Sequence, residues 1–123
     1  MTRQPGIFFL EDDPGLAKVL KFHLEQMGCK ICGTTTHGEG AFEKIRAAKP
    51  DLVLIDIKLA GLMDGIDVGD ILSTKTDIPF IYLTSHSDRE TLLRAGRTIP
   101  EGYLKKPYDP EQLRITIEMA LNR

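Results

Sequence analysis

The sequence lacks any long hydrophobic run. Its apolar segments are far shorter than the about 20 residues that a helix needs to cross a bilayer. Residues 1–6 also lack the apolar stretch of a signal peptide. We therefore expect a cytoplasmic protein without a membrane partner.

The sequence also lacks a strong excess of either charge. Its formal net charge is −2, which gives no reason to expect direct nucleic-acid binding through a basic surface. Repeats, low-complexity tracts and linkers are absent too. A chain of 123 residues, with 41% hydrophobic and 28% charged residues, has the size and composition of one globular domain. We expect a single domain over 1–123, with its core at about 7–121.

Cysteine is scarce, and the two that occur have the C-x-x-C spacing of redox and zinc motifs. Cys29 and Cys32 follow Met27-Gly28, where a helix should end, and fall in a predicted strand. Side chains three residues apart on a strand point to opposite faces, so the sulfurs should not meet. A second Cys or His pair at zinc-finger spacing is missing. We interpret both as free cysteines, with a redox or metal motif as the alternative.

What the sequence does contain is a regular alternation of short apolar and amphipathic segments. Strands are predicted at 7–11, 29–34, 51–56, 78–83 and 102–105. Helices are predicted at 14–27, from 38–40 to 48, around 68–72, near 88–97 and at 109–121. Five βα units predict an α/β fold, in which helices cover both faces of a parallel sheet.

The first predicted helix shows the helical pattern clearly. Pro14 stands near its start and Gly28 just after its end. Its apolar positions repeat at intervals of three and four residues: Leu16, Val19, Leu20, Leu24 and Met27. His23 lies on the same stripe, and we interpret it as a packed or edge residue rather than a metal ligand.

Polar residues follow four of the predicted strands at the point where each ends. Glu11-Asp12-Asp13 follows the first, Asp56 ends the third, Thr84 follows the fourth and Lys106 the fifth. Ligands of an open parallel sheet bind outside the carboxyl ends of its strands, so these groups should converge. Carboxylates, a hydroxyl and an ammonium suit a hard divalent cation and a phosphoryl group.

The three carboxylates of Glu11, Asp12 and Asp56 would repel one another unless cations neutralise them. Mg²⁺ together with Lys106 would supply the required positive charge, and Mg²⁺ prefers such an open site. The alternative is that these acids only cap helices and solvate loops, which is our interpretation of Asp13 before Pro14. A carboxylate in this cluster can act as a nucleophile toward phosphorus, with Lys106 and Thr84 contacting the phosphoryl oxygens.

Together these motifs resemble the receiver domain of two-component response regulators, from Ile7 to about Leu121. The resemblance is carried by Glu11-Asp12-Asp13-Pro14, Asp56-Ile57, Met63-Asp64-Gly65, Thr84 and Gly102-Tyr103-Leu104-Lys105-Lys106-Pro107. It implies a flavodoxin-like fold with a five-stranded sheet in the order 2-1-3-4-5. The sequence departs from the common receiver-domain pattern at three places. The segment 56–65 is one residue longer, Ala60 stands where a proline is frequent, and Ser85 stands where an alanine is common.

The resemblance also implies roles for individual residues. Asp56 would accept a phosphoryl group from a phosphohistidine of a sensor histidine kinase or phosphotransfer protein. Asp12 and Asp56 would bind Mg²⁺ directly, with the backbone carbonyl of Lys58, while Glu11 would act through water. Lys106, which precedes the proline, would contact the phosphoryl group, and Lys105 should point away. Such a domain is not an enzyme, apart from its own phosphorylation and dephosphorylation.

Two further expectations concern signalling. Thr84 and Tyr103 would form a switch that moves when Asp56 is phosphorylated; an ordinary half-buried aromatic is the alternative for Tyr103. The face made by the fourth helix, fifth strand and fifth helix would bind a partner or form a homodimer, with Ile115 and Met119 exposed on it. Single exposed apolar residues are also normal on a protein surface.

Three rival functions fit parts of the pattern. An aspartate-nucleophile phosphatase would normally carry its nucleophile after the first strand in an Asp-x-Asp motif. A flavodoxin-like electron carrier would need a phosphate-binding loop where Asp12-Asp13-Pro14 places negative charge. A docking module that had lost phosphorylation would not need Asp56, Thr84 and Lys106.

Overall fold

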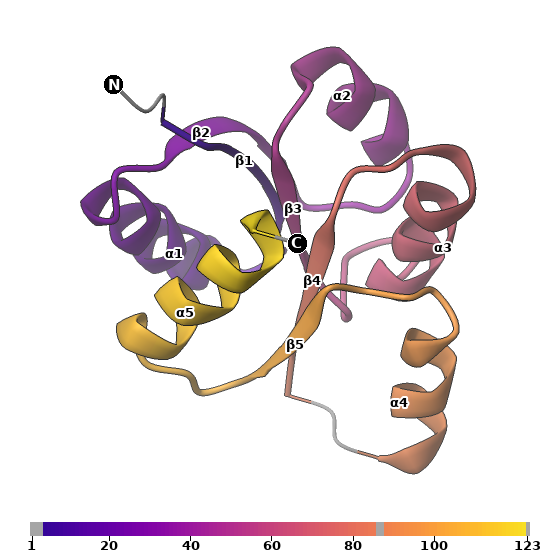
Figure 1. Cartoon of the computed structure of the whole chain (residues 1–123). Helices are drawn as coiled ribbons and strands as arrows, with labels where there is room; N and C mark the ends of the chain where they lie inside the picture. Colours follow the sequence, from indigo (N-terminus) through magenta and orange to yellow (C-terminus); the bar gives the residue numbers. More distant parts are fainter. Residues whose placement is uncertain (1–3, 86–87, 123) are drawn as a thin grey trace.

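The computed structural model describes residues 4–85 and 88–122 and contains the five predicted βα units (Figure 1). The strands are β1 (Gly6–Leu10), β2 (Lys30–Thr35), β3 (Leu52–Asp56), β4 (Phe80–Thr84) and β5 (Gly102–Lys105). The helices are α1 (Pro14–Gln26), α2 (Ala41–Ala48), α3 (Gly65–Lys75), α4 (Arg89–Gly96) and α5 (Pro110–Leu121). Most bounds lie within two residues of the predicted ones. The third helix extends beyond the predicted 68–72 at both ends, because the Asp64 cap starts it at Gly65 and the polar residues 73–75 continue it.

All five strands are parallel and lie in the order β2-β1-β3-β4-β5, the flavodoxin-like order that the resemblance implies. The register pairs Leu10 with Ile55 and Asp56 with Leu83. Thr84 pairs with Lys105 on the neighbouring strand. The carboxyl ends of β1, β3, β4 and β5 therefore meet at one edge of the sheet, as ligand binding at this edge requires.

Helices cover both faces of the sheet. α1 and α5 lie on one face, and α2, α3 and α4 lie on the other (Figure 1). The strands β1, β3 and β4 are buried along their whole length, so successive side chains enter opposite layers. Phe9 and Leu54 pack in the layer of α1 and α5, and Phe8 and Ile55 pack in the other. Truncating one such side chain to alanine costs about 2–5 kcal/mol, so the strand ends are firmly held.

The apolar stripe of α1 is only partly buried. Asp13 caps the helix as predicted, since its side chain accepts a hydrogen bond from the Leu16 N–H at 3.0 Å. Leu20 and Leu24 are buried, but Leu16 is 46% and Val19 53% exposed. The stripe is wider than the part of the helix that contacts the sheet, and its first turns face the segment that follows β5.

The two cysteines are free thiols, as predicted from their place near a strand. Cys29 is buried just before β2, and Cys32 is partly buried within it. Burial raises the pKa of the Cys29 thiol, which makes it a poor nucleophile. The C-x-x-C spacing therefore reflects packing.

No helix within residues 4–85 and 88–122 is long and apolar enough to cross a membrane. Residues 1–3, on which part of the argument about a signal peptide rests, lie outside the described residues.

Candidate functional site

Three carboxylates converge where β1 and β3 end. Glu11 and Asp12 follow β1, Asp56 is the last residue of β3, and one oxygen from each lies within 4.8 Å of the others. Glu11 and Asp56 are buried, whereas Asp12 is exposed. The acidic cluster predicted from the sequence thus forms, and its oxygen ligands fit a hard divalent cation.

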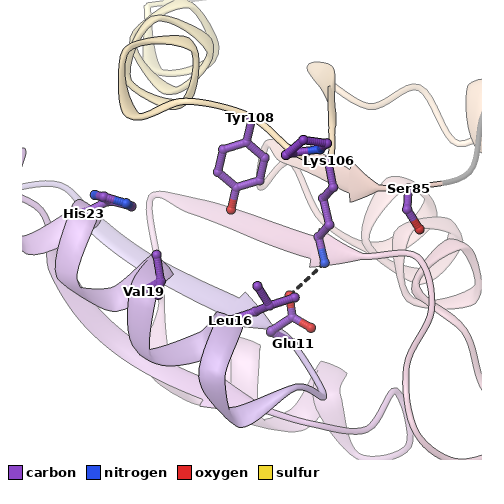
Figure 2. A pocket seen from close by; sticks show the side chains of 8 residues that line it. Glu11, Leu16, Val19, His23, Ser85, Lys106 and Tyr108 are labelled. Atoms are coloured by element: carbon purple, nitrogen blue, oxygen red, sulfur yellow. Dashed lines mark hydrogen bonds and ion pairs between the residues drawn. The ribbon is translucent and has the colours of Figure 1, made fainter.

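Lys106 supplies the positive charge beside this cluster. Its Nζ donates hydrogen bonds to Glu11 Oε1 at 2.9 Å and to Asp56 Oδ2 at 2.8 Å. Figure 2 shows the side chain reaching from the segment after β5 down to Glu11. The neighbouring Lys105 ends β5 and is exposed to solvent. The structure therefore places Lys106, and not Lys105, against the acids, as the sequence predicts.

The charges in the cluster perturb one another. Burial raises the pKa of Glu11 above its ordinary value, the adjacent Asp56 raises it further, and Lys106 opposes both effects. Burial alone would lower the pKa of Lys106, but its hydrogen bonds to Asp56 and Glu11 raise it. Lys106 is therefore a permanent cation, and a second cation would relieve the remaining repulsion between the carboxylates.

The cluster opens into a cavity of ≈ 400 Å³ that reaches the loop after β3. Its lining consists of Glu11, Asp12, Asp13, Pro14, Leu16, Asp56, Lys58, Ser85 and Lys106. The Lys58 N–H donates to Asp56 Oδ1 at 3.2 Å, so this loop turns directly over the carboxylate. A metal ion could be held here by Asp12, Asp56 and the Lys58 backbone carbonyl, and the carboxylates present fit that role.

A second, more apolar pocket of ≈ 370 Å³ adjoins the first between α1 and the segment after β5 (Figure 2). It is lined by Glu11, Leu16, Val19, His23, Ser85, Lys106, Pro107 and Tyr108. Sequence reasoning missed this pocket, because helical periodicity alone does not show that Leu16 and Val19 stay exposed. The exposed apolar pair directly after the acidic motif was the available signal.

Thr84 ends β4, whereas Tyr103 lies within the neighbouring β5 opposite Tyr82, and the two have different environments. Thr84 is buried, whereas the Tyr103 side chain is 41% exposed. The centroid of the Tyr103 ring lies 6.0 Å from the ring centroid of the buried Tyr82. The predicted pair therefore occupies adjoining strands, with the Tyr103 ring directed partly into solvent.

An ionic contact joins α4 to the start of α3. The Arg94 guanidinium donates to Asp64 at 2.5 Å and to Asp67 at 2.8 Å. These two acids also cap α3, because each side chain accepts the backbone N–H of the other. Burial opposes ionisation of Asp64, but Arg94 and the Asp67 N–H lower the pKa of its carboxyl. The sequence analysis did not find this contact.

The last helix separates its apolar residues as predicted. Leu113, Ile117 and Ala120 are buried against the sheet. Ile115 and Met119 are 47% and 73% exposed. These two side chains are therefore available at the surface of the chain.

The family is decided by comparison with known proteins. The family model described as "Response regulator receiver domain" matches residues 7–118. The chain belongs to this receiver domain family. Receiver domains bind Mg²⁺ in general, interact with histidine kinases or phosphotransfer proteins, and form a family of signalling regulators rather than enzymes.

Curated relatives of this receiver domain are response regulators. The DNA-binding response regulator MtrA of Mycolicibacterium smegmatis is 32% identical over 99% of the chain. The transcriptional regulatory protein PdtaR of Mycobacterium tuberculosis is 32% identical over 95% of the chain. The chain spans 53% of MtrA and 57% of PdtaR, which is about half the length of each relative.

Solved receiver domains have the same fold. The signal receiver domain of a modulated diguanylate cyclase from Desulfovibrio desulfuricans is 37% identical, with a TM-score of 0.91 over 97% of this chain and 94% of that one. The BeF3-activated receiver domain of RstA from Klebsiella pneumoniae is 28% identical, with a TM-score of 0.88 over 96% and 99%. The flavodoxin-like architecture is therefore that of the family.

Proposed function

We propose that this receiver domain accepts a phosphoryl group on Asp56 from a phosphohistidine of a sensor histidine kinase or phosphotransfer protein, in a Mg²⁺-dependent reaction. The observation that carries the proposal is the position of Asp56. Its carboxylate ends a buried strand, lies 2.8 Å from the Lys106 ammonium and opens into the acidic cavity. We also propose that residues 1–123 form a single receiver domain, with its core at about 7–121.

The reaction forms one bond and breaks another. An Asp56 oxygen attacks phosphorus, the P–N bond to histidine breaks, and its electron pair returns to the ring nitrogen, which takes up a proton. Lys106 orients the carboxylate before attack and contacts a phosphoryl oxygen afterwards. Mg²⁺, held by Asp12, Asp56 and the Lys58 carbonyl, with Glu11 bound through water, would neutralise charge on the phosphoryl group.

Intact-mass spectrometry after incubation with acetyl phosphate and Mg²⁺ tests this function. We expect the mass to rise by one phosphate, the gain to require Mg²⁺ and hydroxylamine to remove it. A phosphatase would instead release phosphate with turnover, and a docking module would gain no mass.

The apolar pocket beside α1 supports docking of the protein that carries the phosphohistidine. Leu16 and Val19 expose apolar surface next to the cavity that contains Lys106 (Figure 2). A helix that presents a phosphohistidine can cover this surface while its imidazole reaches Asp56. The pocket is therefore suited to bind the apolar face of a donor protein.

A charge at Val19 is expected to slow phosphotransfer from a protein donor but not from acetyl phosphate. Val19→Glu should slow phosphotransfer from the cognate kinase by at least about tenfold, because a carboxylate is buried in an apolar contact. Phosphorylation by acetyl phosphate should stay unchanged. Ile99→Glu, at another exposed apolar residue, is the control. Equal kinase rates for wild type and Val19→Glu would contradict docking on α1.

Thr84 and Tyr103 are proposed to convert phosphorylation into a change of surface. The phosphoryl group on Asp56 carries acceptor oxygens, to which the Thr84 hydroxyl can donate a hydrogen bond. Movement of Thr84 toward these oxygens makes room for the Tyr103 ring. A hydrogen bond to a charged group contributes about 1.5–3 kcal/mol, which changes the ratio of two states by roughly ten- to a hundredfold.

Thr84→Ala is therefore expected to uncouple the switch. In wild type containing fluorotyrosine, beryllofluoride should move the Tyr103 fluorine resonance as the half-exposed ring becomes buried. Thr84→Ala should lose this shift while it still binds beryllofluoride, and Thr84→Ser, which keeps the hydroxyl, should retain it. A Tyr103 resonance that is identical in free and bound wild type would refute the coupling.

The face of α4, β5 and α5 is proposed as the surface for a partner or a homodimer. Besides Ile115 and Met119, it exposes Leu92, Leu93 and Tyr103. We expect beryllofluoride to strengthen self-association in sedimentation, and Ile115→Glu/Met119→Glu to remove the gain. Phe22→Glu, on α1, is the control. Identical association of wild type and the double variant would leave these residues as ordinary surface.

A further inference from the structure

The loop between β3 and α3 is held by a segment that lies outside the site. The Ala60 N–H donates to the Thr36 carbonyl at 3.2 Å, and His37 forms a β-bridge with Ala60. Next along this segment, Glu39 reaches the same loop with its side chain. Its Oε2 accepts the Leu62 N–H at 2.9 Å, and its Oε1 accepts the Met63 N–H at 3.4 Å.

Two glycines allow this close approach. A Cβ at Gly61 would lie 2.7 Å from Glu39 Oε2, and Gly61 also has a positive φ of 90°. A Cβ at Gly38 would lie 2.8 Å from the Met63 Cβ. The two segments are therefore packed as tightly as their backbones allow. The bound N–H of Leu62 lowers the pKa of Glu39, so the group that holds the loop is a carboxylate.

Apolar packing leaves Leu62 free of the core, although the next residue, Met63, packs against it. Leu62 is 97% exposed, although Leu59 and Ile66 on either side are buried. The polar contacts from the segment before α2 therefore restrain residues 60–62, and Met63 is held both by Glu39 and by its packing on the core. The same loop contains Lys58, whose N–H bonds Asp56 and whose carbonyl is the proposed metal ligand.

We propose that Glu39 is a positioning residue, whose carboxylate holds the loop so that the Lys58 carbonyl stays directed at the metal site. This inference rests on the proposed function. Glu39 touches neither the metal nor the phosphoryl group and acts through the backbone of residues 58–63. Its loss should lower Mg²⁺ affinity without unfolding the domain.

Calorimetric titration with Mg²⁺ tests the proposal, together with hydrogen exchange of the Leu62 amide. Glu39→Ala should weaken Mg²⁺ binding roughly three- to tenfold, less than the about 10–100-fold typical when a group that orients a ligand directly is lost. Gly61→Ala should act in the same direction, since its Cβ displaces the carboxylate. The Leu62 amide should exchange faster in both variants.

Two further variants test whether the hydrogen bonds of the Glu39 side chain or only its negative charge matter. Glu39→Gln keeps an acceptor without the charge and should give intermediate affinity. Glu43→Ala removes an exposed charge from nearby α2 and should change nothing. Equal losses in Glu39→Gln and Glu39→Ala, or an unchanged Glu39→Ala, would overturn the positioning role. Wild type that binds no Mg²⁺ or gains no phosphate on Asp56 would instead overturn the proposed function.

Discussion

Asp56→Asn is expected to abolish the Mg²⁺-dependent, hydroxylamine-sensitive gain of one phosphate. The carboxamide is a far weaker nucleophile than a carboxylate and cannot form an acyl phosphate with retention of its nitrogen. The rate should fall by at least about a thousandfold, as it does when a covalent nucleophile is lost. Intact-mass spectrometry and peptide mapping with acetyl phosphate measure this loss.

The control is Asp70→Asn, which removes an exposed carboxylate from α3 and should leave the rate unchanged. The fold should survive Asp56→Asn, because the amide fits the same space and removes one charge from a repulsive cluster. Label on another residue at a comparable rate would show that Asp56 is not the acceptor.

Asp12→Ala is expected to move metal affinity and stability in opposite directions. Loss of a carboxylate ligand should weaken Mg²⁺ binding by at least about tenfold. The same change relieves repulsion with Glu11 and Asp56, which lie within 4.8 Å of it, so the metal-free domain should gain about 0.5–1 kcal/mol in unfolding free energy. Calorimetry with Mg²⁺ and urea unfolding in EDTA measure the two effects.

Replacement of the adjacent acid, Asp13, is expected to lower the stability that Asp12→Ala raises. Asp13→Ala removes the cap on the Leu16 N–H and should cost about 1 kcal/mol of unfolding free energy, because a first-turn amide loses its acceptor. Unchanged Mg²⁺ affinity in Asp12→Ala would exclude Asp12 as a ligand. A loss of stability in that variant would show that repulsion does not dominate the cluster.

Much of the site was predictable because it depends on where strands end. Asp56 follows four apolar residues whose short run between polar residues predicts a buried strand, and the parallel topology then places it beside Glu11. The family resemblance selects Lys106, the lysine before the proline, and the structure places its ammonium beside Glu11 and Asp56. These features are encoded by local pattern and by one rule of topology.

Other features depend on distances between elements, which periodicity does not contain. Leu16 and Val19 lie on a helical stripe that looks suitable for packing, yet both stay exposed and line a pocket with Tyr108, from the segment after β5. Arg94 and Glu39 are ordinary surface charges in the sequence. Their contacts with Asp64 and with the Leu62 N–H arise only when α4 and the segment before α2 are brought to the loop after β3.

Few contacts attach the fourth helix, α4, to the rest of the domain, and they limit the free energy that holds it in place. Within α4, all of which is described, Ala95 is the buried residue. Thr98 follows the helix, and its hydroxyl donates a hydrogen bond to the Ala95 carbonyl. The same hydroxyl therefore accepts a hydrogen bond from the Tyr82 hydroxyl at 2.6 Å. The ion pairs of Arg94 are exposed, and such pairs contribute about 0–1 kcal/mol each. The ion pairs of Arg94 therefore contribute only a small part of the about 5–15 kcal/mol that unfolds a domain, and α4 depends on Ala95 and on the hydrogen bonds of Thr98 for its attachment.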